Sequence, residues 1–111
     1  MTFKITQKDS SPSLLVTLGD GTDPVDLTNV NDVRFIMQDK YERIVINEGI
    51  QDSVNIIDVD LGQVEFIFDS DQTADAGTYE AEWEVEFLNG AIETFPTSDR
   101  KMKVEIVEQI G

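Results

Sequence analysis

Hydrophobic and polar residues alternate with a period of two along most of this chain. In the stretch 79–87 every second residue is apolar or aromatic, namely Tyr79, Ala81, Trp83, Val85 and Phe87. The four positions between them are all glutamate. Successive side chains of a β-strand point to opposite faces of a sheet, so this alternation predicts a strand with one buried face. No segment keeps a helical period for ten residues, and the pattern predicts an all-β protein.

Shorter segments with the same alternation lie on both sides of this stretch. Strands are predicted over residues 3–5, 13–18, 33–38, 43–47, 54–57, 63–68, 79–87, 91–95 and 102–106, with a brief edge pairing at 25–27. Turn-forming residues separate them, as at positions 19–24. About eight to ten short strands are typical of an antiparallel β-sandwich. The chain has 111 residues, so we expect a single domain over residues 1–111.

The segment from Asp75 to Ala81 narrows this prediction to an immunoglobulin-like sandwich. It has the layout of a tyrosine corner, in which a tyrosine at the start of a strand hydrogen-bonds back to the preceding loop. Tyr79 takes that place, and Ala81 takes the core position two residues later. The alternative is that Tyr79 is simply another core aromatic residue.

Asn89 and Gly90 predict a tight hairpin after the long strand. Asn-Gly is favoured in a type I′ turn, which needs positive φ at both central residues. A two-residue turn here places Glu86 opposite Glu93 on the outer face. Like charges in this position repel each other, so the pair could mark a surface suited to a basic partner. The alternative, which we favour, is that Lys103 or Arg34 relieves the repulsion within the chain.

The alternating glutamates of this strand allow two interpretations. They could form a cation site or a basic-partner site, or they could form a solvated face neutralised by bases on neighbouring strands. Adjacent same-face residues lie about 6.6–6.8 Å apart, too far to hold one small cation together. Outward-pointing Arg34, Lys101 and Lys103 are placed to neutralise the strand, and we favour this second interpretation.

Composition excludes several classes of function. The chain has no histidine and no cysteine, which removes thiolate metal sites, disulfides and the usual catalytic bases. It has no nucleophile motif and no phosphate-binding loop, so we expect no enzyme activity and no cofactor. The Asp58–Gly62 and Asp69–Asp71 segments resemble fragments of calcium loops but lack the full ligand spacing, and aspartate in turns usually caps the turn.

A net charge of −15 argues against binding to nucleic acid or to anionic membranes. We also find no signal peptide and no apolar segment long enough to span a membrane. The acidity favours a basic partner, although a halophilic source would produce a similar charge.

Two aromatic residues fall outside the expected core. Tyr41 lies in a polar loop, and Phe95 is out of phase with Ile92 unless a bulge intervenes. Trp83 is expected in the core because its same-face neighbours are apolar. The candidate partner-contact residues are therefore Tyr41, Glu84, Glu86, Glu93 and Phe95.

Several motifs, in order along nearly the whole chain, resemble the N-terminal domain of phage baseplate upper proteins. They are Gly19–Thr28 followed by Val33–Met37, then Gly62–Phe66, Ala76–Trp83, Asn89-Gly90 and Thr94-Phe95-Pro96. The resemblance implies an immunoglobulin-like module that links receptor-binding or fibre components to the phage tail. Its partners would be other phage structural proteins, with several copies assembled in the virion, and it supplies no catalytic residues.

Family members usually continue into long fibre segments, whereas this sequence stops at Gly111. A head-fibre or decoration protein is therefore one alternative. A bacterial surface module of the immunoglobulin-like adhesion type is another. A carbohydrate-binding module would need a row of exposed aromatic residues, and only Tyr41 and Phe95 are candidates.

Overall fold

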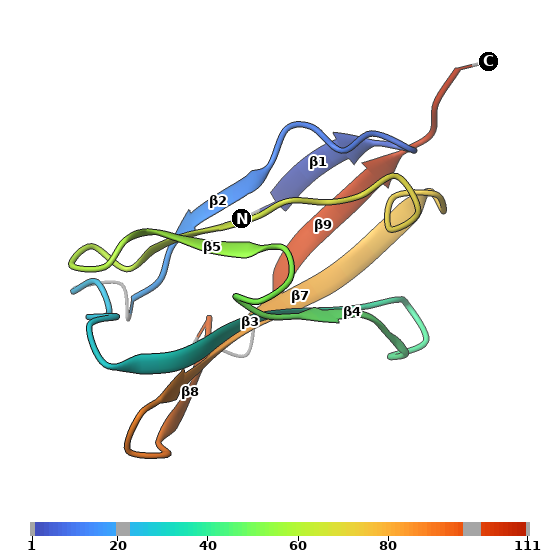
Figure 1. The fold of residues 1–111 in the computed structure, drawn as a ribbon. Helices are drawn as coiled ribbons and strands as arrows, with labels where there is room; N and C mark the ends of the chain where they lie inside the picture. The colour runs from blue at the N-terminus through green and yellow to red at the C-terminus, as the bar shows by residue number, and fades with distance from the viewer. Residues whose placement is uncertain (1, 20–22, 97–100, 111) are drawn as a thin grey trace.

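The computed structural model describes residues 2–19, 23–96 and 101–110, and these residues contain no helix. The strands form two sheets packed face to face (Figure 1). The larger sheet contains β1 (Thr2–Thr6), β3 (Val30–Gln38), β4 (Ile44–Glu48), β7 (Gly77–Phe87), β8 (Ile92–Phe95) and β9 (Met102–Val107). The smaller sheet contains β2 (Leu14–Thr17), β5 (Val54–Asp58) and β6 (Gln63–Phe66). The predicted all-β sandwich of short strands is confirmed.

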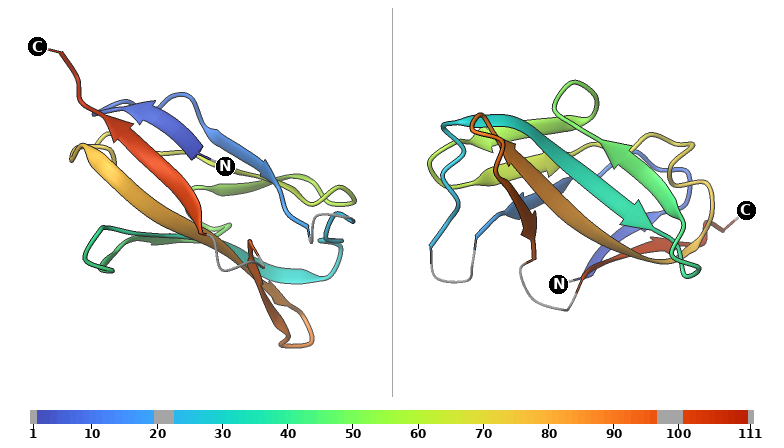
Figure 2. Two further views of the ribbon diagram at one scale, coloured as in Figure 1. Left: turned by 180° about the vertical axis from the view of Figure 1, so that it is seen from behind. Right: turned by 90° about the horizontal axis from the view of Figure 1, so that it is seen from below.

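The strand order is that of an immunoglobulin-like sandwich. The smaller sheet has the order β2-β6-β5, and the larger has the order β1-β9-β7-β3-β4, with β8 also paired to β7. The two views in Figure 2 show both layers. Because the chain crosses between sheets after β1, β2, β4 and β6, strands that are neighbours in sequence pack across the core. One pair departs from the antiparallel prediction, since β1 runs parallel to β9.

A cluster of aromatic residues fills the space between the sheets. Phe35 of β3 contacts Phe66 of β6, with ring centroids 4.4 Å apart, and Trp83 of β7 at 5.0 Å. Phe68 meets Phe66 edge-on at 4.9 Å. Offset and edge-to-face contacts of this kind add about 0.5–1.5 kcal/mol to the burial of the rings. Trp83 is 1% exposed, so its predicted place in the core is confirmed.

The predicted tyrosine corner is present at the start of β7. The Tyr79 hydroxyl donates a hydrogen bond to the backbone carbonyl of Asp75 at 2.7 Å. Partial burial, together with the negative charges of Asp75 and Asp39, raises the pKa of Tyr79. This contact ties the loop before β7 to the strand that follows it.

The hairpin after β7 exists, but the predicted type I′ turn is wrong. The loop has three residues, 88–90, because the Gly90 N–H donates to the Phe87 carbonyl and the Phe87 N–H donates to the Ala91 carbonyl. Gly90 has a φ of +89°, whereas Asn89 is not among the residues with positive φ. The Asn89 side chain instead accepts a hydrogen bond from the Ala91 N–H at 2.9 Å. A turn followed by a glycine with positive φ is the usual three-residue hairpin connection.

The extra loop residue shifts the register of β8 by one and turns every side chain of that strand to the other face. Glu86 therefore lies opposite Ile92, and the predicted Glu86–Glu93 pair does not form. Glu93 lies opposite Val85, on the core-facing side. The same shift brings Phe95 opposite Trp83 and explains its phase.

Residues 18–19 and 23–27 belong to none of the nine strands. The predicted edge pairing at 25–27 is limited to hydrogen bonds from Val25 N–H to the Leu18 carbonyl and from Leu27 N–H to the Val59 carbonyl. One isolated bridge joins Gly19 and Pro24. The middle of the predicted turn, residues 20–22, lies outside the described residues.

Candidate interaction surface

Tyr41 lies at the tip of the β3–β4 hairpin with 66% of its surface exposed. The Lys40 ammonium and the Arg43 guanidinium lie 5.1 and 5.2 Å from its ring centroid. Asp39 organises the loop, since its carboxylate accepts the backbone N–H groups of Tyr41 and Arg43 and the Arg43 side chain. Although desolvation acts in the opposite direction, these hydrogen bonds and the Arg43 charge hold the pKa of Asp39 below its usual value.

The structure separates the five predicted contact residues. Glu84 and Glu86 lie together on the outer face of β7. Tyr41 is at the other end of the sheet, because antiparallel pairing places the end of β3 beside the start of β7. Glu93 is on the opposite side of the β7–β8 hairpin from the two glutamates. Phe95 is 4% exposed, so its prediction as an exposed contact residue is wrong.

The bases predicted to neutralise β7 cover only its first half. Lys101 forms an ion pair with Glu82, and Lys103 lies opposite Glu80 in the register. Among the described residues, no Lys or Arg forms an ion pair with Glu84 or Glu86. Neutralisation by neighbouring strands is therefore confirmed for Glu82 alone, through the Lys101 ion pair.

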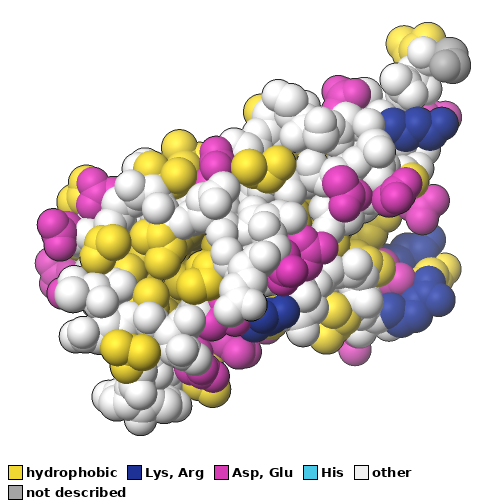
Figure 3. Space-filling view, in the orientation of Figure 1, with side chains coloured by type: hydrophobic (Ala, Val, Ile, Leu, Met, Phe, Trp, Pro, Cys, Tyr) yellow, Lys and Arg dark blue, Asp and Glu magenta, His cyan; other side chains and the backbone are white. Residues whose placement is uncertain are grey.

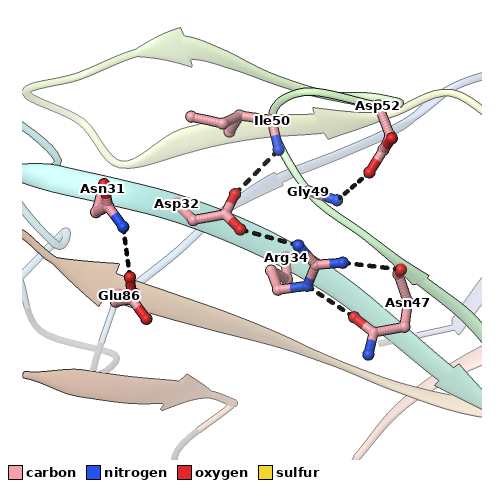
Figure 4. Close-up of polar contacts among 8 residues, drawn as sticks. All are labelled: Asn31, Asp32, Arg34, Asn47, Gly49, Ile50, Asp52 and Glu86. Carbon is pink, nitrogen blue, oxygen red and sulfur yellow. Dashed lines mark hydrogen bonds and ion pairs between the residues drawn. The ribbon is translucent and has the colours of Figure 1, made fainter. Parts of the chain in front are cut away.

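Arg34 lies opposite Glu84 but is held elsewhere (Figure 4). Its guanidinium donates to the Asp32 carboxylate at 2.9 Å, to the Asn47 side-chain oxygen at 2.8 Å and to the Asn47 carbonyl at 2.9 Å. Asp32 also accepts the Ile50 N–H at 3.1 Å. Arg34 therefore joins β3, β4 and the turn after β4, and its ion pair is with Asp32, not with Glu84.

The backbone of Gly49 packs directly against this network. A β-carbon at Gly49 would lie 2.6 Å from an Asp32 carboxylate oxygen and 2.8 Å from an Arg34 guanidinium nitrogen. Sequence reasoning missed the network, although residues 32 and 34 share one face of a strand by the period of two. The opposite charges of Asp32 and Arg34, two residues apart and followed by a turn at Gly49, could have indicated this network.

A polar pocket of about 280 Å³ lies beside the network. It is lined by Asn31, Asp32, Arg34, Gly49, Ile50, Gln51 and Asp52. Asn31 extends the polar surface to β7, because its side-chain amide donates to the Glu86 carboxylate (Figure 4). We define the acidic face as Glu84, Glu86 and the neighbouring Ile92, which is 56% exposed.

The aspartates that resemble calcium-loop fragments hold turns. The Asp58 carboxylate accepts the N–H groups of Asp60 and Leu61, and Asp69 and Gln72 exchange hydrogen bonds. In residues 2–19, 23–96 and 101–110 there is no group of three or more acidic side chains placed to hold a metal ion. No helix in the same part of the chain could cross a membrane.

Comparison with known proteins agrees with the fold and with the motifs. The family model of the BppU N-terminal domain, the N-terminal domain of baseplate upper proteins, matches residues 2–108. No curated protein gives a significant match to the chain. The chain therefore belongs to the family of baseplate upper protein N-terminal domains and is a structural component of a phage baseplate.

Proposed function

We propose that this domain is an adaptor that links receptor-binding or fibre components to the phage tail through protein–protein contacts. Its acidic face docks against a basic surface of another baseplate protein. The observation that supports this proposal is the pair Glu84 and Glu86, which has no basic partner among the described residues, beside the exposed Ile92. The role requires no catalysis, and it fits one domain over residues 1–111, present in several copies in the particle.

The chemistry of the acidic face suits a basic partner. Two carboxylates on one strand, without an ion pair to any described Lys or Arg, give a local negative potential, which steers a positive surface into register. An exposed aliphatic side chain next to them supplies apolar area that a partner can bury. Arg34 lies opposite Glu84, but its ion pair is with Asp32. Lys101 pairs with Glu82, and Lys103 lies opposite Glu80.

Binding to each purified protein of the same baseplate, measured at low and high salt, tests this proposal. The double variant Glu84→Gln, Glu86→Gln should bind its partner roughly tenfold more weakly at low salt. The difference should shrink as the screening length falls toward about 3 Å at 1 M salt.

Glu93→Gln is the control, because it removes one carboxylate charge on the same hairpin but on the other side, and it is matched to each of the single variants Glu84→Gln and Glu86→Gln. It should bind like the wild type. Equal binding of the double variant and the wild type to every baseplate protein would exclude the acidic face as a docking surface.

A further inference from the structure

The outer face of the three-stranded sheet has a composition unlike that of the rest of the molecule. Along β2, β5 and β6 its residues alternate with side chains that point into the core, and the alternation continues after β6 to the buried Phe68. The residues of this face are Ser13, Leu15, Thr17, Asn55, Ile57, Asp58, Gln63, Glu65 and Ile67. Two of them are charged, and Asp58 lies at the end of β5, opposite Gln63. We call this set the neutral face.

Three aliphatic side chains of the neutral face are open to solvent. Leu15 is 49% exposed, Ile57 is 50% exposed and Ile67 is 43% exposed. In Figure 3 hydrophobic side chains gather on the left, around and below β5, whereas Lys and Arg lie at the right and below the middle. Interface cores are poor in charged residues, and this face shares that property.

The Asp58 carboxylate of the neutral face accepts the N–H groups of Asp60 and Leu61, and the Glu65 carboxylate at its centre is also fixed in position. Glu65 lies on the central strand β6, opposite Leu15 on one side and Asn55 on the other. The Ser13 hydroxyl donates to one of its carboxylate oxygens at 2.7 Å, and the Asn55 amide donates to the other at 3.3 Å. Both donors are neutral, so these contacts set the orientation of the carboxylate without forming an ion pair.

We infer that the neutral face is a second docking surface, and that its partner presents one arginine or lysine among aliphatic side chains. The basic group would meet Glu65, and the aliphatic groups would cover Leu15, Ile57 and Ile67. Covering the face without a cation would bury an unpaired carboxylate, which is strongly unfavourable. The same face of a second copy does not satisfy that requirement, because an isologous contact would bring a second Glu65 to the interface.

The inference rests on the proposed adaptor function and extends it. The acidic face and the neutral face are the outer faces of the two sheets, so they lie on opposite sides of the sandwich. Two partners could therefore bind at the same time. One contact would depend strongly on salt, and the other would depend on salt only weakly, because buried charge pairs are screened less.

Binding to each purified baseplate protein tests the neutral face with two variants. Glu65→Gln removes the charge, and Leu15→Ser with Ile67→Ser removes aliphatic area. Loss of one member of a buried charge pair should weaken binding by about 30-fold or more, at both low and high salt. Ile44→Ser is the matched control, since Ile44 is 61% exposed on the other sheet. An unchanged melting temperature establishes that each variant is folded.

Crosslinking in assembled baseplates identifies the two partners separately. A photoreactive amino acid at position 15 should crosslink to a different protein from one at position 92. Wild-type binding of the neutral-face variants, with reduced binding of Glu84→Gln, Glu86→Gln, would overturn this inference and leave the proposed function intact. If the neutral-face variants and the acidic-face variant all bound like the wild type, the proposed function and this inference would both be overturned. If both kinds of variant lost the same partner, the neutral face would not be a separate docking surface.

Discussion

The Tyr79 hydroxyl lies 2.7 Å from the backbone carbonyl oxygen of Asp75 and donates a hydrogen bond to it. Tyr79→Phe keeps the ring and removes this bond, so unfolding should require about 0.5–1.5 kcal/mol less free energy. Urea denaturation measures the difference. Tyr41→Phe is the control, because Tyr41 is 66% exposed and should change stability by less than about 0.5 kcal/mol. Equal effects of the two variants would contradict a structural role for the corner.

The same tyrosine predicts a dependence of stability on alkaline pH. Partial burial and the charges of Asp75 and Asp39 raise the pKa of Tyr79 above its ordinary value of 10.0. The folded state therefore holds this proton more tightly than the unfolded state. The stabilisation is complete below the unfolded pKa and is lost as the pH rises through the folded pKa. Denaturation midpoints at pH values on both sides of about 10 should fall more for the wild type than for Tyr79→Phe.

Trp83 should dominate the stability of the core. It is the single tryptophan and is 1% exposed, so Trp83→Ala should destabilise the fold by about 3–5 kcal/mol. A domain of ordinary stability would then be largely unfolded at room temperature. Circular dichroism during heating measures the loss, with Val107→Ala as a control at a 41% exposed site. A melting temperature close to that of the wild type would contradict the burial of the indole.

The register of β8 can be tested by comparing two of its side chains. Phe95 is 4% exposed opposite Trp83, so Phe95→Ala should destabilise by about 3–5 kcal/mol. Ile92 is 56% exposed opposite Glu86, so Ile92→Ala should change stability by less than about 0.5 kcal/mol. A larger effect at Ile92 than at Phe95 would indicate the two-residue turn and the opposite register.

Gly49→Ala should disturb the Arg34 network. The new β-carbon would lie 2.6 Å from an Asp32 carboxylate oxygen, so the carboxylate must move away from its partners. In the Asp32→Ala variant that oxygen is absent. Gly49→Ala should therefore lower the free energy of unfolding less in this variant than in the wild type. A double-mutant cycle should give a coupling energy of about 0.5–3 kcal/mol. If the changes in unfolding free energy of the two substitutions were strictly additive, the β-carbon added at position 49 would not disturb the Asp32 carboxylate.

The strand pattern was predictable because one face of each sheet is buried. Alternation identified the core positions Ala81, Trp83 and Val85 of β7, and a local motif placed Tyr79. Both signals are contained within a few residues of sequence. The parallel pairing of β1 with β9 was not predicted, because it joins segments about 100 residues apart and depends on the whole strand order.

The turn after β7 and the partner of Arg34 were predicted wrongly, because in each case two local arrangements are compatible with the sequence. An Asn-Gly pair fits a two-residue turn, yet a loop that includes Leu88 buries Phe95 against Trp83. The burial of a phenylalanine outweighs the preference among turn types, and sequence alone does not reveal this gain. In the same way Arg34 lies near the carboxylates of Glu84 and Asp32. It binds Asp32, whose carboxylate also accepts the Ile50 N–H in the turn after β4.

The parallel pairing of β1 with β9 has a mechanical consequence. Residues Thr2 to Thr6 lie beside Lys103 to Val107 in continuous register. A force that pulls the start of β1 away from the end of β9 acts along both strands and in opposite directions. The hydrogen bonds between them run across that direction, so they share the load together and are not opened one after another. The domain is therefore built to resist stretching along this axis.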